Sequence, residues 1–164
     1  MLARGGLTVM RRSLNTQPCV IDAARLSAAA RLAELSEELG YPVSVEVMTE
    51  RLRRALSRAE DLVLVAEHAE QGVIGWIHGA EREFLESEPR CEILGLVVKA
   101  EHRGSGVGRA LVAALERWAA DRGLKQMAVR SNVARNEAHP FYERLGYVRA
   151  KTQHAYRKAI ASTA

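Results

Sequence analysis

Residues 91–109 read CEILGLVVKAEHRGSGVGR: an apolar run, a turn with three glycines, and the start of an amphipathic helix. The apolar run 91–99 is typical of a strand buried in the centre of a sheet. The glycines let backbone N–H groups approach a ligand closely, and a helix start adds unpaired N–H groups with partial positive charge. Arg103 and Arg109 flank the turn with full positive charges. The segment therefore predicts a cradle for a phosphate or pyrophosphate.

Two familiar phosphate-binding motifs do not fit this turn. A P-loop ends in Gly-Lys-Ser/Thr, and that tripeptide is absent from the chain. A dinucleotide fingerprint needs a glycine three residues after Gly106 or Gly108, where the sequence has Arg109 and Leu111. Taken alone, the glycine turn is equally consistent with a tight strand-to-helix connection.

The periodicity on either side of this segment predicts an α/β fold with a mixed sheet and helices on both faces. The expected order is strand 19–24, helix 27–39 with Ser27 as N-cap, helix 44–56, a hairpin of strands 61–67 and 73–81, strand 91–99, helix 107–122, strand 125–131, helix 136–145 and strand 147–160.

Composition limits the class of protein. The chain has 164 residues, 48% hydrophobic and 27% charged, which fits one domain over 16–164 after a disordered extension over 1–15. No apolar stretch is long enough to span a membrane, and Cys19 and Cys91 are expected to be reduced thiols of a cytoplasmic protein. The five histidines have no metal-ligand spacing, so we expect no metal. A pI near 9.4 does not by itself indicate nucleic-acid binding, because aromatic platforms and a recognised motif are missing.

Residues 96–111, with the pattern L-x-V-x-x-x-x-R-G-x-G-x-G-R-x-L, resemble the acetyl-CoA-binding signature of the GNAT superfamily of N-acetyltransferases. Residues 138–147, AHPFYERLGY, resemble the second signature of that family, in the expected order and separation. The resemblance covers residues 19–160 and implies a splayed sheet. It also implies direct transfer of acetyl from acetyl-CoA to an amine, without nucleic acid or membrane as partner, and leaves a homodimer open. A non-catalytic acyl-CoA-binding or sensor domain of the same fold is the alternative.

The resemblance also assigns residues. The backbone of Val97 and Val98, with Leu96 beside them, would bind the pantetheine arm as an added strand would. Pyrophosphate would lie on the amides of Arg103, Gly104, Ser105, Gly106, Val107, Gly108 and Arg109. Tyr142 stands where the family has a tyrosine that protonates the leaving thiolate, and its alternative role is a core aromatic.

One position departs from the family pattern. Many members have asparagine where this chain has Arg135, so Asn132 or Asn136 would contact the coenzyme instead. Branches resembling aminoglycoside acetyltransferases carry this arginine with an Ala-His pair, as here.

Transfer to an amine requires a base, because the attacking nitrogen must lose a proton. Glu92 resembles the glutamate that serves this purpose on the fourth strand of some members. It would share a strand face with Leu94, Leu96 and Val98 unless a bulge intervenes. A solvated strand-end carboxylate is the alternative, and Glu81, Glu83, Glu86 and Glu88 are other candidate bases or a rim that attracts cations. Cys91, on a core strand, is not expected to form an acyl-enzyme.

Overall fold

The computed structural model describes residues 19–132 and 138–161. The chain divides into two compact units, Met1–Arg130 and Ser131–Ala164. The elements of the first unit are β1 (Cys19–Ala23), η1 (Leu26–Ala28), α1 (Ala29–Glu38), α2 (Val45–Leu56), β2 (Asp61–His68), β3 (Gly72–Arg82), β4 (Arg90–Val98), η2 (Ala100–His102), α3 (Val107–Asp121) and β5 (Met127–Val129). The second unit contains α4 (Ala138–Arg144).

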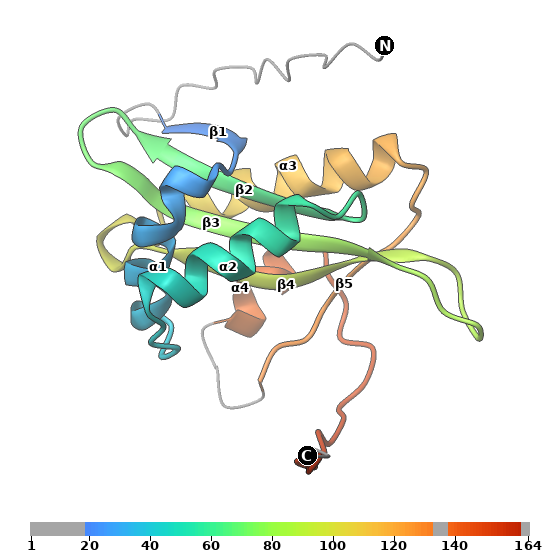
Figure 1. Cartoon of the computed structure of the whole chain (residues 1–164). Helices are drawn as coiled ribbons and strands as arrows, with labels where there is room; N and C mark the ends of the chain where they lie inside the picture. The colour runs from blue at the N-terminus through green and yellow to red at the C-terminus, as the bar shows by residue number, and fades with distance from the viewer. Residues whose placement is uncertain (1–18, 133–137, 162–164) are drawn as a thin grey trace, which may run out of the picture. The chain divides into compact units, whose positions relative to one another are not determined.

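The first unit is built on a mixed five-stranded sheet in the order β1-β2-β3-β4-β5 (Figure 1). Neighbouring strands are antiparallel except for β4 and β5, which are parallel. Strand β5 pairs only with the stretch from Cys91 to Ile93. The remaining residues of β4 have no strand on that side in the described part of the chain. This opening confirms the expected mixed, splayed sheet.

Helices cover both faces of this sheet, as predicted (Figure 1). On one face, α1 and α2 pack their buried side chains, such as Leu32 and Leu52, against Val63, Val65 and Val97. Helix α3 lies on the other face, where a Cβ on Gly79 would collide with the Leu115 side chain. The sheet is therefore the middle layer of the first unit.

A β-bulge at Leu94 changes the face on which the β4 side chains lie. His78 pairs with Gly95 and Gly79 pairs with Ile93, so Leu94 is an extra residue on β4. Because side chains alternate along a strand, Glu92 lies on the face opposite Leu96 and Val98. The expectation that Glu92 shares a face with these residues was conditional on an unbulged strand, and it is wrong for this reason.

Helix α1 begins later than predicted. A 3-10 turn occupies Leu26–Ala28, and Ser27 lies inside it rather than capping a helix. The Ala28 N–H donates to the Arg25 carbonyl at 2.9 Å. This N–H is therefore satisfied by a backbone acceptor and not by a capping side chain. Helix α2 has the cap that α1 lacks, since Ser44 Oγ accepts from the Val47 N–H at 3.3 Å.

The predicted strand over 147–160 is wrong. These residues have no regular structure, and Val148, Tyr156 and Ile160 are exposed. A strand needs a neighbour for its backbone groups, and none of the described strands pairs with this segment. Strand β5 is likewise shorter than the predicted 125–131, because its pairing stops where the β4 bulge begins.

Residues 1–15 of the expected extension, and Arg135 and Asn136, lie outside the described residues. Within the described ranges, no helix has the length and apolarity needed to cross a bilayer.

Candidate active site

The glycine turn connects η2 to α3 and leaves a row of backbone donors at the helix start. Gly106, the residue before α3, has φ of 94°, a conformation that other residues rarely adopt. The first helical bond runs from the Ala110 N–H to the Gly106 carbonyl at 3.0 Å. In the part of the chain that the structure describes, the N–H groups of Gly106, Val107, Gly108 and Arg109 donate to no protein acceptor. Such a row of donors at a helix start suits an anion.

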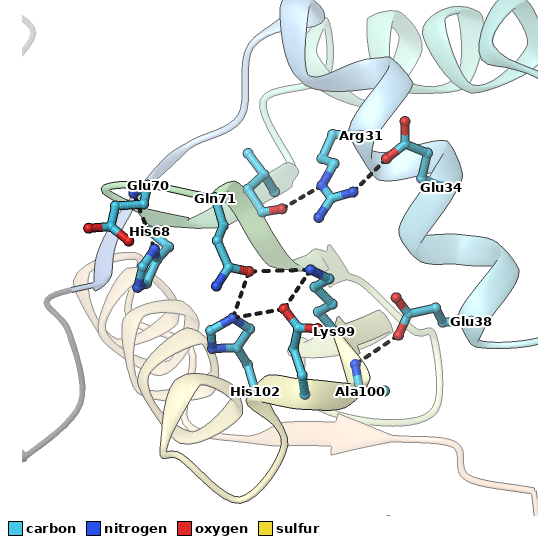
Figure 2. Close-up of polar contacts among 11 residues, drawn as sticks. Arg31, Glu34, Glu38, His68, Glu70, Gln71, Lys99, Ala100 and His102 are labelled. Atoms are coloured by element: carbon cyan, nitrogen blue, oxygen red, sulfur yellow. Dashed lines mark hydrogen bonds and ion pairs between the residues drawn. The ribbon is translucent and has the colours of Figure 1, made fainter.

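A set of polar contacts fixes residues 99–102, which lead into the glycine turn (Figure 2). The amide oxygen of Gln71, in the β2–β3 turn, accepts from Lys99 Nζ at 3.2 Å and from His102 Nε2 at 3.1 Å. At the end of α1, Glu38 Oε2 accepts from the Ala100 N–H at 2.8 Å. We call Glu38, Gln71, Lys99 and His102 the loop brace. Its partners come from three elements distant in sequence, so sequence reasoning missed it.

Arg103 lies back over the end of β4. Its Nε donates to the Val98 carbonyl at 3.2 Å, and its Nη2 is 4.0 Å from Glu38 Oε2. The Lys99 N–H donates to the Ile74 carbonyl. In an antiparallel ladder this places the backbone groups of Val97 toward β3 and those of Leu96 and Val98 toward the open side. On its open side, β4 therefore presents backbone groups only from alternate residues.

Glu92 is a paired carboxylate near the start of β4. Its side chain is 13% exposed, and Oε1 lies 3.1 Å from Arg90 Nη2 and 3.7 Å from Arg130 Nη2. Arg90 is fixed in turn by Phe84, whose ring centroid is 3.9 Å from the guanidinium carbon. The candidate base therefore has two cations on one oxygen.

The other acidic candidates differ in their surroundings. Glu81 Oε2 pairs with Arg122 Nη2 at 2.7 Å and is partly buried. Glu83, Glu86 and Glu88 are exposed in the connection from β3 to β4. We call these three side chains the acidic rim.

Cys91 is fully buried on β4, and this burial raises the pKa of its thiol to about 11. A thiol is a poor nucleophile in its protonated form, which supports the rejection of an acyl-enzyme. Among the described residues, no group of three or more His, Cys, Asp or Glu side chains is placed to hold a metal ion.

In the second unit, the C-terminal capping motif of α4 positions Tyr142. Gly146, with φ of 91°, follows the helix. The Gly146 N–H donates to the Glu143 carbonyl, and the Tyr147 N–H donates to the Tyr142 carbonyl, both at 3.0 Å. This is a Schellman motif, and the accompanying side-chain contact is the Tyr142–Tyr147 ring pair at 5.5 Å. Phe141 contacts the Tyr142 ring edge to face at 5.0 Å.

Comparison with known proteins settles the family. Residues 29–147 match the sequence model of the Acetyltransferase (GNAT) family. The chain belongs to the GNAT family of acetyltransferases. It is thus an acetyl-CoA-dependent N-acetyltransferase, as the two signatures predicted.

Individual GNAT relatives agree with this assignment. The chain is 32% identical over 123 residues to "Aminoglycoside N(6')-acetyltransferase type 1" of Stenotrophomonas maltophilia, covering 73% of this chain and 79% of that protein. The crystal structure of the aminoglycoside antibiotic 6'-N-acetyltransferase AAC(6')-Ih from Acinetobacter baumannii has the same fold, with a TM-score of 0.77 and 22% identity over 88% of this chain and 100% of that one. AAC(6')-Iy, in complex with the bisubstrate analog CoA-S-monomethyl-acetylneamine, has a TM-score of 0.78 and 20% identity, again over 88% of this chain and 100% of its own.

Of the GNAT site residues predicted from sequence, the glycine turn closely follows the end of β4, and its Arg103 bonds to the Val98 carbonyl. Glu92 lies on the same strand but beyond the bulge. Asn132 belongs to the second unit, where its carbonyl oxygen lies 3.1 Å from His139 Nε2.

Sequence reasoning missed one further polar pair of this GNAT domain. His78 Nε2 lies 3.1 Å from Asp61 Oδ2, with the two residues on neighbouring strands. Asp61 opens a strand and His78 lies within one, so only the pairing register brings them together.

Proposed function

We propose that this GNAT enzyme transfers acetyl from acetyl-CoA to a primary amine of a small polycation of the aminoglycoside type. The observation that carries the acceptor class is the 32% identity to an aminoglycoside N(6')-acetyltransferase over 73% of the chain. The acidic rim supports it, because three exposed carboxylates near the start of β4 attract a polycation.

The coenzyme has a defined place in this proposal. Its pyrophosphate lies on the four unpaired amides at the start of α3, with Arg103 and Arg109 beside it. Its pantetheine arm runs along the open side of β4 and bonds to the backbone of Leu96 and Val98. Arg103 must then release the Val98 carbonyl, which it holds at 3.2 Å in the free protein. The thioester comes to lie beyond Leu96, next to the bulge at Leu94.

The chemistry needs one group to take a proton and one to give a proton. An alkyl ammonium has a pKa near 10.4, so roughly one molecule in a thousand is neutral near pH 7. Glu92 is the proposed base, acting through a water molecule. Tyr142 is the proposed acid for the departing thiolate, since a phenol is protonated at neutral pH. Its placement at the coenzyme sulfur is supported by the resemblance of residues 138–147 to the second family signature.

A panel of amines tests this proposal, with release of the CoA thiol as the readout. We expect turnover of aminoglycosides that carry an amine at the 6' position and none of matched aminoglycosides that carry a hydroxyl there. Mass spectrometry should locate the acetyl group on the 6' nitrogen. Spermidine and a lysine-containing peptide complete the panel. Efficient acetylation of the peptide with no turnover of any aminoglycoside would replace the proposed acceptor class.

A further inference from the structure

A carboxylate–imidazole pair lies outside the residues assigned so far. Asp61 begins β2, and its side chain is 1% exposed. Asp61 Oδ2 accepts from His78 Nε2 at 3.1 Å and lies 3.7 Å from Arg58 Nη1. The other oxygen, Oδ1, is buried and has no donor in the described part of the chain. His78 is more open, with 25% of its side chain exposed.

The register of the sheet puts this pair next to Glu92. Ala80 of β3 pairs with Asp61 on one side and with Glu92 on the other. Cross-strand partners share a face, so Asp61, His78 and Glu92 all lie on the same side of the sheet. His78 and Glu92 are diagonal neighbours on adjacent strands, a relation in which the Cα atoms are typically about 7–8 Å apart and long side chains come within reach of each other. A water molecule can connect two polar side chains that do not bond directly.

The same face carries the described buried polar atoms that lack a partner. They are Asp61 Oδ1, Trp76 Nε1 and Arg90 Nε. Trp76 pairs with Val97, and its alternation with His78 places it on this side of β3. Arg90 is two residues before Glu92 and bonds to it. Buried polar atoms without a protein partner are the usual contacts of bound water or ligand.

The geometry fixes which nitrogen of His78 is available. An ionised carboxylate only accepts hydrogen bonds, so the bond to Asp61 requires a proton on Nε2 of His78. A neutral imidazole then has its lone pair on Nδ1. A carboxylate that holds an imidazole in one tautomer is the arrangement that prepares a histidine to act as a base. Imidazole is the side chain that most readily changes its charge near neutral pH, which suits it to proton transfer.

We propose that His78 receives the proton that leaves the acceptor ammonium, by way of Glu92 and a bridging water, and that Asp61 is the positioning residue. This inference rests on the proposed function. One proton moves from the ammonium nitrogen to Nδ1 of His78, and Nε2 keeps its proton on Asp61. The neutral amine attacks the thioester carbonyl, the C–S bond breaks, and the second nitrogen proton ends on the CoA thiol. The imidazolium then returns its proton to solvent.

The charged residues near His78 come from several elements. Asp61 begins β2, and Arg58 lies in the connection from α2 to β2. Glu92 and Arg90 lie on β4, and Arg130 follows β5. The side chains that α2 buries, Leu52 and Ala55, carry no charge. The carboxylate nearest to the imidazole is therefore that of Asp61.

The test uses the full chain with the best acceptor from the amine panel. We expect His78→Ala to lower kcat about 10²-fold at pH 7, with the loss shrinking as pH rises and free amine becomes abundant. Added imidazole should restore a measurable part of the activity. Asp61→Asn should cause a smaller loss with the same dependence on pH. Asp22→Asn, which changes an exposed aspartate on β1, is the matched control and should leave the pH profile unchanged.

Nitrogen NMR of the imidazole provides a readout that does not depend on turnover. In the free protein, His78 should carry its proton on Nε2, and Asp61→Asn should alter that tautomer balance. A proton on Nδ1 in the wild-type protein would overturn the inference, as would a His78→Ala protein with the wild-type pH profile. If the wild-type protein acetylates no amine, the proposed function fails, whereas the NMR measurement still decides the state of the pair.

Discussion

At the scale of single residues, the surroundings of Glu92 determine what it can do. Arg90 and Arg130 both approach Oε1, which leaves Oε2 for a water molecule or an ammonium group. Replacement by glutamine keeps one oxygen for the arginines and replaces the other by an uncharged NH2 group, which cannot accept a proton. Glu92→Gln therefore separates the chemical role of this residue from its structural one.

We expect Glu92→Gln to lower kcat by roughly 10²-fold near neutral pH, which is the usual size of a general-base effect. The loss should shrink as pH rises, because a growing fraction of the amine is then already neutral. Steady-state rates across the pH range check this, with Glu70→Gln, at an exposed glutamate in the turn between β2 and β3, as the control. A wild-type kcat at every pH would assign the role of base to water or to a carboxylate between Glu81 and Glu88.

Tyr142 is tested by removing its hydroxyl and keeping its ring. Tyr142→Phe retains the contacts with Phe141 and Tyr147, so the free energy of unfolding should change little. If the phenol protonates the CoA thiolate, kcat should fall by roughly 10–10³-fold with a much smaller change in affinity for the coenzyme. Rapid-quench measurement of the chemical step decides between this and a core role. Tyr156→Phe, at an exposed tyrosine, is the control.

At the scale of elements, the start of α3 depends on the conformation of Gly106. A valine there would have to adopt a φ near 94°, a conformation that β-branched residues very rarely take. Gly106→Val should weaken CoA binding at least ~10-fold, because an anion can no longer approach the backbone closely. Isothermal calorimetry on the folded variant checks this. Gly123→Val at the far end of α3, where φ is 78°, reproduces the backbone strain and should leave CoA affinity unchanged.

The loop brace makes a different prediction. Glu38→Ala removes the acceptor of the Ala100 N–H and the carboxylate beside Arg103. A hydrogen bond contributes on the order of 1 kcal/mol, so we expect KM for acetyl-CoA to rise about 5-fold with kcat unchanged. Glu38→Gln retains an acceptor oxygen and should recover part of the affinity. Glu34→Ala, one turn earlier on α1, serves as the control, and an equal effect there would mean that α1 acts only through its stability.

At the scale of the whole molecule, coenzyme binding should raise the free energy of unfolding. A ligand that binds only the folded protein stabilises it by about 2.7 kcal/mol at 100 times its Kd. Thermal unfolding with and without CoA measures this increase. The increase should be lost in Gly106→Val and retained in Glu92→Gln, since Glu92 is not part of the pyrophosphate cradle. An equal shift in both variants would place the coenzyme away from the turn.

The sequence was sufficient to predict those elements that local sequence patterns determine. The hairpin, the central strand and the long helix were predicted within a few residues because period and turn residues mark them. The strand predicted over 147–160 was wrong, because an exposed segment becomes a strand only where a neighbouring strand accepts its backbone hydrogen bonds. The glycine turn could be read from spacing. The Asp61–His78 pair and the loop brace could not, because each depends on which residues face each other across strands.

The bulge at Leu94 has a consequence for anyone who compares or transplants this strand. The extra residue reverses the alternation of β4 side chains between the two faces of the sheet. Even-numbered residues before the bulge therefore lie on the face that odd-numbered residues occupy after it. Counting residues across it, as an ungapped alignment does, equates side chains that point to opposite sides of the sheet. If β4 were grafted into another protein without this one residue, the side chains on one side of the deletion would point to the wrong face of the sheet.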